Sequence, residues 1–307
     1  MKKTFIAIMA VATIAACNKA EVVDLNQGEE IAFGNAFVDN VTKVFYGNQS
    51  GETPLAAFNV YGAVTDFEGN AIAIYSGDKV TGTIAENSVW QCEDQTKVQY
   101  WIKGAKYNFA ALVDAGTVEP GEDKLPKSFT YTYTPEDPKD VLYARSAADI
   151  VGQESNNPKV AFSFGHMLSK VKFTLTNTSL NATDYTYKVS GIKITNAIQS
   201  GTCTVATKTW TSTATGETVF GALGTDVLMI PGAYEAKLEF TIDLYYKGSK
   251  ITSTTYTGET AKTVAVNFKA GYAYNFNISV GVTDPIQFTV STYPTWTDAT
   301  SNPSVTL

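Results

Sequence analysis

"AKLEFTIDLYY", residues 236–246, decides the fold class of this 307-residue chain. Its apolar and polar residues alternate, so a strand through it has one buried face and one wet face, and the inward set is Leu238, Phe240, Ile242 and Leu244. The stretch "GYAYNFNISV", residues 271–280, repeats the same alternation. Two such strands bury their apolar faces against each other when two sheets pack together, which predicts a β-sandwich.

Short runs of the same kind recur toward the amino terminus. "AAFNVYGAV" (56–64) is followed by the turn-rich "TDFEGNA" (65–71), and "VQYWI" (98–102) precedes "YNFAALV" (107–113). Residues 114–139 contain four prolines, which predicts a loop with one short strand at "SFTYTY" (128–133). No segment of convincing length has helical periodicity, so the chain is predicted to be all-β.

The length of the chain favours two domains, because single cores stop growing at about 250–300 residues. A polar Asn-Asn-Pro turn ends at Pro158, and we place the boundary beside it. The expected division is a tether and first strand over residues 17–40, an amino-terminal domain over 41–155 and a carboxy-terminal domain over 156–307.

The first seventeen residues, "MKKTFIAIMAVATIAAC", have the form of an export signal. Two lysines precede an apolar run of about 12 residues, which is too short to span a bilayer. Ile-Ala-Ala-Cys resembles the bacterial lipobox, so we expect a signal peptide over residues 1–16 and acylation of Cys17. The lipid would anchor the mature protein to a membrane without spanning it.

The composition argues against an enzyme and against a nucleic-acid-binding protein. The chain has one histidine, three cysteines and a single arginine, Arg145, which is a poor inventory for catalytic triads or metal sites. Its net charge is −7, and the chain that follows Cys17 has lost two lysines and no acid, giving about −9. We therefore expect no catalytic residues, no cofactor, no metal and no nucleic-acid partner.

The lone histidine, His166, lies in "FSFGHMLSKVKFTL", residues 162–175. It shares the phase of Phe162 and Phe164, whereas Val171 and Phe173 have the opposite phase, so the strand must break near Ser169. We interpret His166 as a structural residue that satisfies a backbone carbonyl at this break. The alternative, a catalytic base, requires an open cleft with an acid and a hydroxyl within about 3 Å of the ring.

Three further groups of residues have a functional and a structural interpretation. A weak resemblance to a calcium-binding loop comes from the alternating positions of Asp66, Glu68 and Asn70. A hairpin turn is favoured, because the other calcium ligands of such a loop are absent. Core packing is favoured over a sugar-stacking platform for four aromatic residues, Trp90, Tyr100, Trp101 and Tyr107. Two buried thiols are favoured over a disulfide between Cys92 and Cys203.

Several ordered segments resemble the fimbrillin-like (Mfa-like) lipoproteins of Bacteroidales, the subunits of type V pili. They are the lipobox at Cys17, "TKVFYG" (42–47), "VQYWIKGAKYNFAAL" (98–112), "VLYARS" (141–146), "FSFGHMLSKVKFTL", "VLMIPG" (227–232), "FKAGYAYNFNISV" (268–280) and "PIQFTVSTYPTWTD" (285–298). The resemblance covers nearly the whole mature chain, and its specificity lies in the order and spacing of these motifs.

The resemblance implies two tandem transthyretin-like β-sandwich domains, display on the outer membrane as a palmitate-bearing lipoprotein, and a role in adhesion. Its partners would be other pilus subunits, joined by β-strand complementation, and a receptor on a host or bacterial surface. In polymerising members a trypsin-like protease, usually cutting after Arg, removes the first strand. Lys43 occupies the matching position here, so either this lysine is cut or the strand stays and the protein is an anchor. A non-polymerising glycan-binding lipoprotein is the alternative.

Overall fold

The computed structural model describes residues 28–38, 55–82, 90–282, 286–293 and 304–306, and most of them lie in strands. This confirms the all-β prediction. The only helical segments in these ranges are two short 3-10 turns, η1 (Gln95–Lys97) and η2 (Gly258–Thr260). None of the helical turns in this described part is long and apolar enough to cross a membrane.

The first sheet is eight-stranded and holds the amino-terminal core. Its order is β1 (Phe33–Val38), β10 (Val160–His166), β8 (Leu142–Arg145), β5 (Lys106–Val113), β2 (Ala57–Thr65), β3 (Ala71–Thr81) and β4 (Gln91–Cys92), and β9 (Ile150–Val151) pairs with β5. All pairings in this sheet are antiparallel except that of β1 with β10.

Two further sheets face each other around a second core. The five-stranded sheet has the order β14 (Val227–Met229), β11 (Ser169–Asn177), β18 (Ala273–Val280), β19 (Gln287–Tyr293) and β20 (Ser304–Thr306). The seven-stranded sheet has the order β16 (Ser249–Tyr256), β15 (Gly232–Tyr246), β12 (Tyr185–Thr204), β7 (Pro126–Thr132) and β6 (Val118–Pro120). There, β13 (Thr209–Val219) pairs with β12, and β17 (Lys262–Phe268) pairs with β15.

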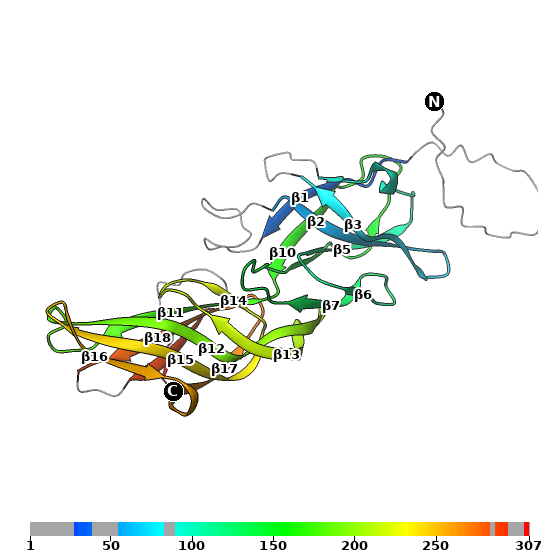
Figure 1. The fold of residues 1–307 in the computed structure, drawn as a ribbon. Coiled ribbons are helices and arrows are strands. Elements are labelled where there is room, and N and C mark those ends of the chain that lie inside the picture. Colours follow the sequence, from blue (N-terminus) through cyan, green and yellow to red (C-terminus); the bar gives the residue numbers. More distant parts are fainter. Residues whose placement is uncertain (1–27, 39–54, 83–89, 283–285, 294–303, 307) are drawn as a thin grey trace, which may run out of the picture.

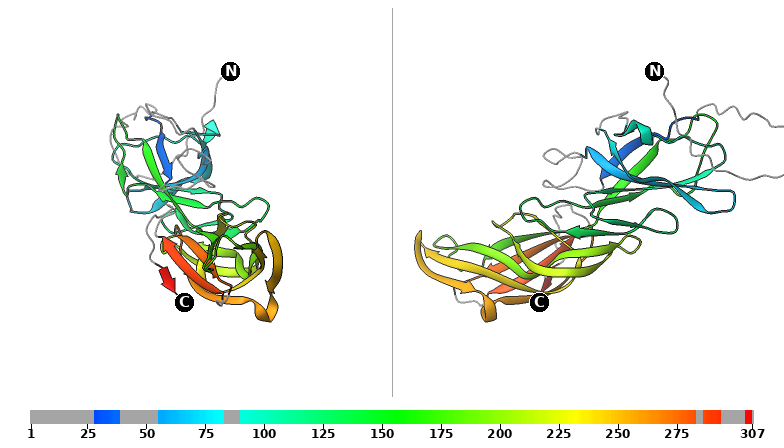
Figure 2. Two further views of the ribbon diagram at one scale, coloured as in Figure 1. Left: turned by 90° about the vertical axis from the view of Figure 1, so that its left-hand side faces the viewer. Right: turned by 45° about the vertical axis from the view of Figure 1, so that its right-hand side comes forward.

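The alternation of β15 and β18 decides which side chains fill this second core. Leu238, Phe240 and Ile242 are buried on β15, and they pack in one cluster with Phe276 and Ile278 of β18. The predicted inward faces of both strands are therefore confirmed, except that Leu244, at the end of the predicted set, is only partly buried. Figures 1 and 2 show the resulting two groups of strands lying one beside the other, with β6 and β7 between them.

The chain passes from the first sheet to the five-stranded sheet between His166 and Ser169. Phe162 and Phe164 belong to the amino-terminal core, whereas Val171 and Phe173 belong to the second core. Met167 donates its backbone N–H to Val141 O at 2.9 Å, and Leu168 O accepts one from Gly271 at 2.9 Å. The predicted break in the strand is this crossing.

Strand pairing does not follow the expected division at residues 155 and 156. β10 lies beyond that division and completes the first sheet, while β7 lies before it and pairs with β12. A third apolar cluster joins the two groups of strands and includes Phe129, Val141, Met167 and Leu228. The division of the chain into two domains remains a prediction.

Candidate strand-exchange site

β1 closes the eight-stranded sheet on itself. Along one edge it pairs in parallel with β10, Phe33 lying opposite Val160. On its other side an isolated bridge joins Phe33 to Trp90, whose backbone N–H donates to Phe33 O at 3.3 Å. Trp90 directly precedes β4, the last strand of the sheet. The first strand of the chain thus connects the two ends of one sheet (Figure 1).

The residues that lead into β1 are held by neighbouring backbone and side-chain groups. Ile31 N donates to Gln99 O at 2.8 Å, and Trp101 N donates to Glu29 O at 2.9 Å. The Glu29 carboxylate accepts the backbone N–H and the side-chain amide of Asn157 at 2.8 and 3.0 Å. These hydrogen bonds hold the pKa of Glu29 below its usual value. These hydrogen bonds attach the start of the segment to residues 99–101 and to Asn157.

The side chains of β1 reach the centre of the amino-terminal core. Phe33 is 1% exposed, and its ring contacts four other buried aromatic rings, those of Phe58, Tyr75, Phe109 and Phe162. Ile31 and Ala36 are also buried. Removal of this segment would uncover an apolar groove and the backbone groups of β10 that now pair with it, which together form a site for another strand.

Two residues expected to be modified or cleaved lie in parts of the chain that the structure does not describe. The acylation residue Cys17 and the expected cleavage residue Lys43 both lie outside the described residues. Arg145, the single arginine, lies on β8 between β5 and β10, and its guanidinium contacts the Asp123 carboxylate at 3.1 Å. Proteases cut extended, mobile chain, so Arg145 is a poor cleavage residue in the folded protein.

His166 is buried at the crossing between the sheets and is 4% exposed. Its Nδ1 lies 2.8 Å from Oδ2 of Asp140, which precedes β8 and is 2% exposed. The partner of Nδ1 is therefore a carboxylate and not the expected backbone carbonyl. Burial raises the pKa of Asp140, and His166 opposes this shift. Sequence reasoning missed Asp140 because nothing in "EDPKDVLYARS" distinguishes it from its acidic neighbours.

A second buried charge lies beside this pair. Lys170 on β11 is 2% exposed, and its Nζ lies 3.8 Å from Oδ2 of Asp226, just before β14. Leu228 lies opposite Lys170 in the strand register. Leu228 and Met167 both belong to the apolar cluster that joins the two groups of strands. The Asp140–His166 and Lys170–Asp226 pairs therefore both lie at the junction beside apolar side chains, and neither lies in an open cleft of the kind that a hydrolase needs.

The other candidate residues have structural positions. Trp90 and Trp101 are 1% and 4% exposed, so neither ring offers a platform to a sugar. Asp66 Oδ1 accepts the backbone N–H groups of Glu68 and Asn70 at 2.9 and 2.7 Å, which makes this segment the expected hairpin turn. Cys92 and Cys203 are free thiols, and they are buried in two different apolar clusters. In the described part of the chain, no cluster of His, Cys, Asp and Glu could hold a metal.

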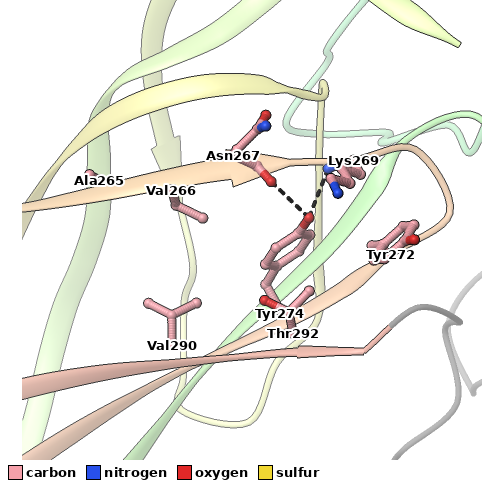
Figure 3. Close-up of a pocket in the computed structure, with 8 residues that line it drawn as sticks. All are labelled: Ala265, Val266, Asn267, Lys269, Tyr272, Tyr274, Val290 and Thr292. Carbon is pink, nitrogen blue, oxygen red and sulfur yellow. Dashed lines mark hydrogen bonds between the residues drawn. The ribbon is translucent and has the colours of Figure 1, made fainter. Parts of the chain in front are cut away.

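A hollow of about 320 Å³ opens between β17 and the β18–β19 pair (Figure 3). Val266 and Val290 line it from the two sheets, and Tyr274 points into it. The Tyr274 hydroxyl donates to Asn267 O at 2.9 Å and accepts the Lys269 N–H at 2.8 Å. The hydroxyl that Tyr274 brings to the hollow is therefore already hydrogen-bonded within the protein. The groove that holds β1 is the stronger candidate site.

Comparisons with known proteins find a matching family and solved structures with a similar fold. The model of the fimbrillin-like family matches residues 42–294. A fimbrial protein from Bacteroides vulgatus has the same fold, with a TM-score of 0.59 and 17% identity over 78% of this chain and 93% of its own. A candidate cell adhesion protein from Bacteroides uniformis gives a TM-score of 0.50 and 21% identity over 87% and 98%. No curated protein matches the chain.

Proposed function

We propose, from the premise that this chain belongs to the fimbrillin-like family, that it is a structural component of a cell-surface fimbrium with a role in adhesion. The similarity in fold to a fimbrial protein supports this proposal. The buried charges at the junction and the hydrogen-bonded turn at Asp66 serve the fold, so we assign the protein no catalytic role.

The position of β1 carries the proposed mode of assembly. The strand lies at the end of a sheet, yet it supplies Phe33 to the middle of the core. A strand from a neighbouring subunit could take its place after cleavage at Lys43, because the groove offers both unpaired backbone groups and apolar pockets. Subunits would then join by strand exchange. If the strand stays, Cys17 remains covalently attached to the folded protein, which then acts as a lipid-anchored subunit on the outer membrane.

The first residue of the surface-displayed protein distinguishes these two modes. Strand exchange predicts a mature chain that begins at Val44 and multimers that resist mild denaturant. A Lys43→Gln variant should begin at acylated Cys17 and lose those multimers, whereas Lys43→Arg should retain them. Lys103→Gln is the matched control, because Lys103 is an exposed lysine. A native chain that always begins at Cys17 and never enters multimers would contradict assembly by strand exchange.

A further inference from the structure

The pocket that holds Phe33 is built to accept an aromatic ring. The Phe33 ring lies edge-on to Phe58 at 6.0 Å, to Tyr75 at 5.7 Å and to Phe109 at 6.3 Å, measured between ring centroids. It stacks on Phe162 at 6.2 Å with an interplanar angle of 19°. Each of these four neighbours is at most 1% exposed. Edge-to-face and stacked pairs stabilise a ring beyond the effect of its buried area.

The walls of this pocket are held by contacts that do not involve β1. Phe58 and Phe162 pack edge to face at 5.3 Å, and Tyr75 lies 6.4 Å from Phe109. The Tyr75 hydroxyl also accepts the backbone N–H of Gln99 at 3.2 Å. Three walls lie on strands that remain paired without β1, because β2 joins β3 to β5. The fourth wall, Phe162, lies on β10, which stays joined to β8 at Gly165 and His166. These contacts hold the walls of the pocket when Phe33 leaves.

Ala36, three residues beyond Phe33 on β1, places a small side chain in the core. Ala36 is 3% exposed and lies opposite Phe162, after a register irregularity that begins at Gly34. Extra methylene groups at such a position force neighbouring side chains out of their preferred rotamers. The groove thus has a large aromatic pocket and, three residues further along the strand, a shallow one.

We propose that this groove selects its incoming strand by an aromatic side chain in the Phe33 pocket, followed three residues later by a residue no larger than alanine. The partner is an extended segment of a neighbouring subunit with this pattern. The inference rests on the proposed strand exchange and adds to it the rule that decides which strand fits.

The rule can be tested on a chain that starts at Asn18 and carries a specific protease site in place of residues 43–44. Cutting it leaves the β1 fragment bound without a covalent link. A fluorescent peptide of residues 28–38, "GEEIAFGNAFV", is then offered in excess, and its exchange into the cut protein is followed by fluorescence polarisation. Variant peptides carry Phe33→Ala, Phe33→Leu or Ala36→Leu, and Glu30→Gln is the control because Glu30 is exposed.

The native and Glu30→Gln peptides should bind alike. Phe33→Ala should bind at least about 100-fold more weakly, because loss of a buried phenylalanine is among the most damaging core substitutions. Phe33→Leu keeps apolar area but loses the ring contacts, so about a tenfold loss is expected. Ala36→Leu should also bind more weakly.

If the Phe33 variants bind within threefold of the native peptide, the selection rule is wrong while strand exchange stands. If the native peptide itself does not exchange, strand exchange fails and the rule fails with it.

Discussion

Removal of one partner from the buried Asp140–His166 pair should destabilise the junction strongly. The two side chains are 1% and 4% exposed, so water cannot replace the lost partner. Loss of one member of such a pair leaves a polar or charged group buried without compensation, at about 3–5 kcal/mol. Typical domains are stable by only about 5–15 kcal/mol, so Asp140→Leu or His166→Phe should lower the unfolding midpoint visibly.

The double variant separates pairing from packing. Asp140→Leu combined with His166→Phe replaces both polar groups by apolar ones, and such replacements are often close to neutral. The double variant should therefore lose less stability than either single variant, and far less than the roughly 6–10 kcal/mol that two single losses of about 3–5 kcal/mol would sum to. Urea unfolding at pH 7 measures the free energy of unfolding of each variant. Fluorescence of Trp210 follows unfolding of the junction, because Trp210 Nε1 donates a hydrogen bond to Met167 O at 3.0 Å.

An exposed ion pair provides the control. Lys103 Nζ lies 2.6 Å from Glu154 Oε2, closer than the buried pair, but these side chains are 71% and 78% exposed. Lys103→Gln should leave the unfolding curve unchanged within error, since solvent screens exposed pairs. The reasoning is refuted if the single variants at Asp140 and His166 each lose less than about 1 kcal/mol, or if their losses add to that of the double variant within about 0.5 kcal/mol.

Two further predictions follow from buried titratable groups. Burial raises the pKa of Tyr274 to about 12, so folded protein keeps a proton that the unfolded chain loses near pH 10. The contribution of Tyr274 to the free energy of unfolding is therefore complete below about pH 10 and is lost as the pH rises through about 12. The free energy of unfolding of a Tyr274→Phe variant should fall less steeply above pH 10 than that of the parent chain. Parallel curves for the two proteins would contradict this. Burial likewise raises the pKa of the Cys203 thiol to about 12 and raises that of Cys92. A thiol reagent should therefore label neither cysteine before denaturant is added, and peptide mapping of labelled native protein would reveal an exception.

The strand pattern and its interruptions were predictable from the sequence because they depend on residues close together in the chain. Alternation fixed which side chains of β15 and β18 face inward, and the phase change around His166 predicted the crossing between sheets. The hairpin turn at Asp66 was also predictable, because its hydrogen bonds join residues at most four positions apart.

The candidate site could be predicted only in outline. The family resemblance indicated a removable first strand, but the local sequence of β1 does not show that Phe33 lies opposite Val160, more than a hundred residues later. Nor does it show that Trp90 completes the closure. Pairings of this kind join residues far apart in the chain, so local periodicity does not specify them.

The sequence by itself determined the strand class and the inward faces, because both follow from local periodicity. The export signal ending at Cys17 rests on a short motif and stays a prediction. Only the tertiary structure decided that Asp140 is the partner of His166 and that Phe33 occupies an aromatic pocket. Both contacts join segments far apart in the chain, and their strength comes from burial, which exists only when the strands have packed together.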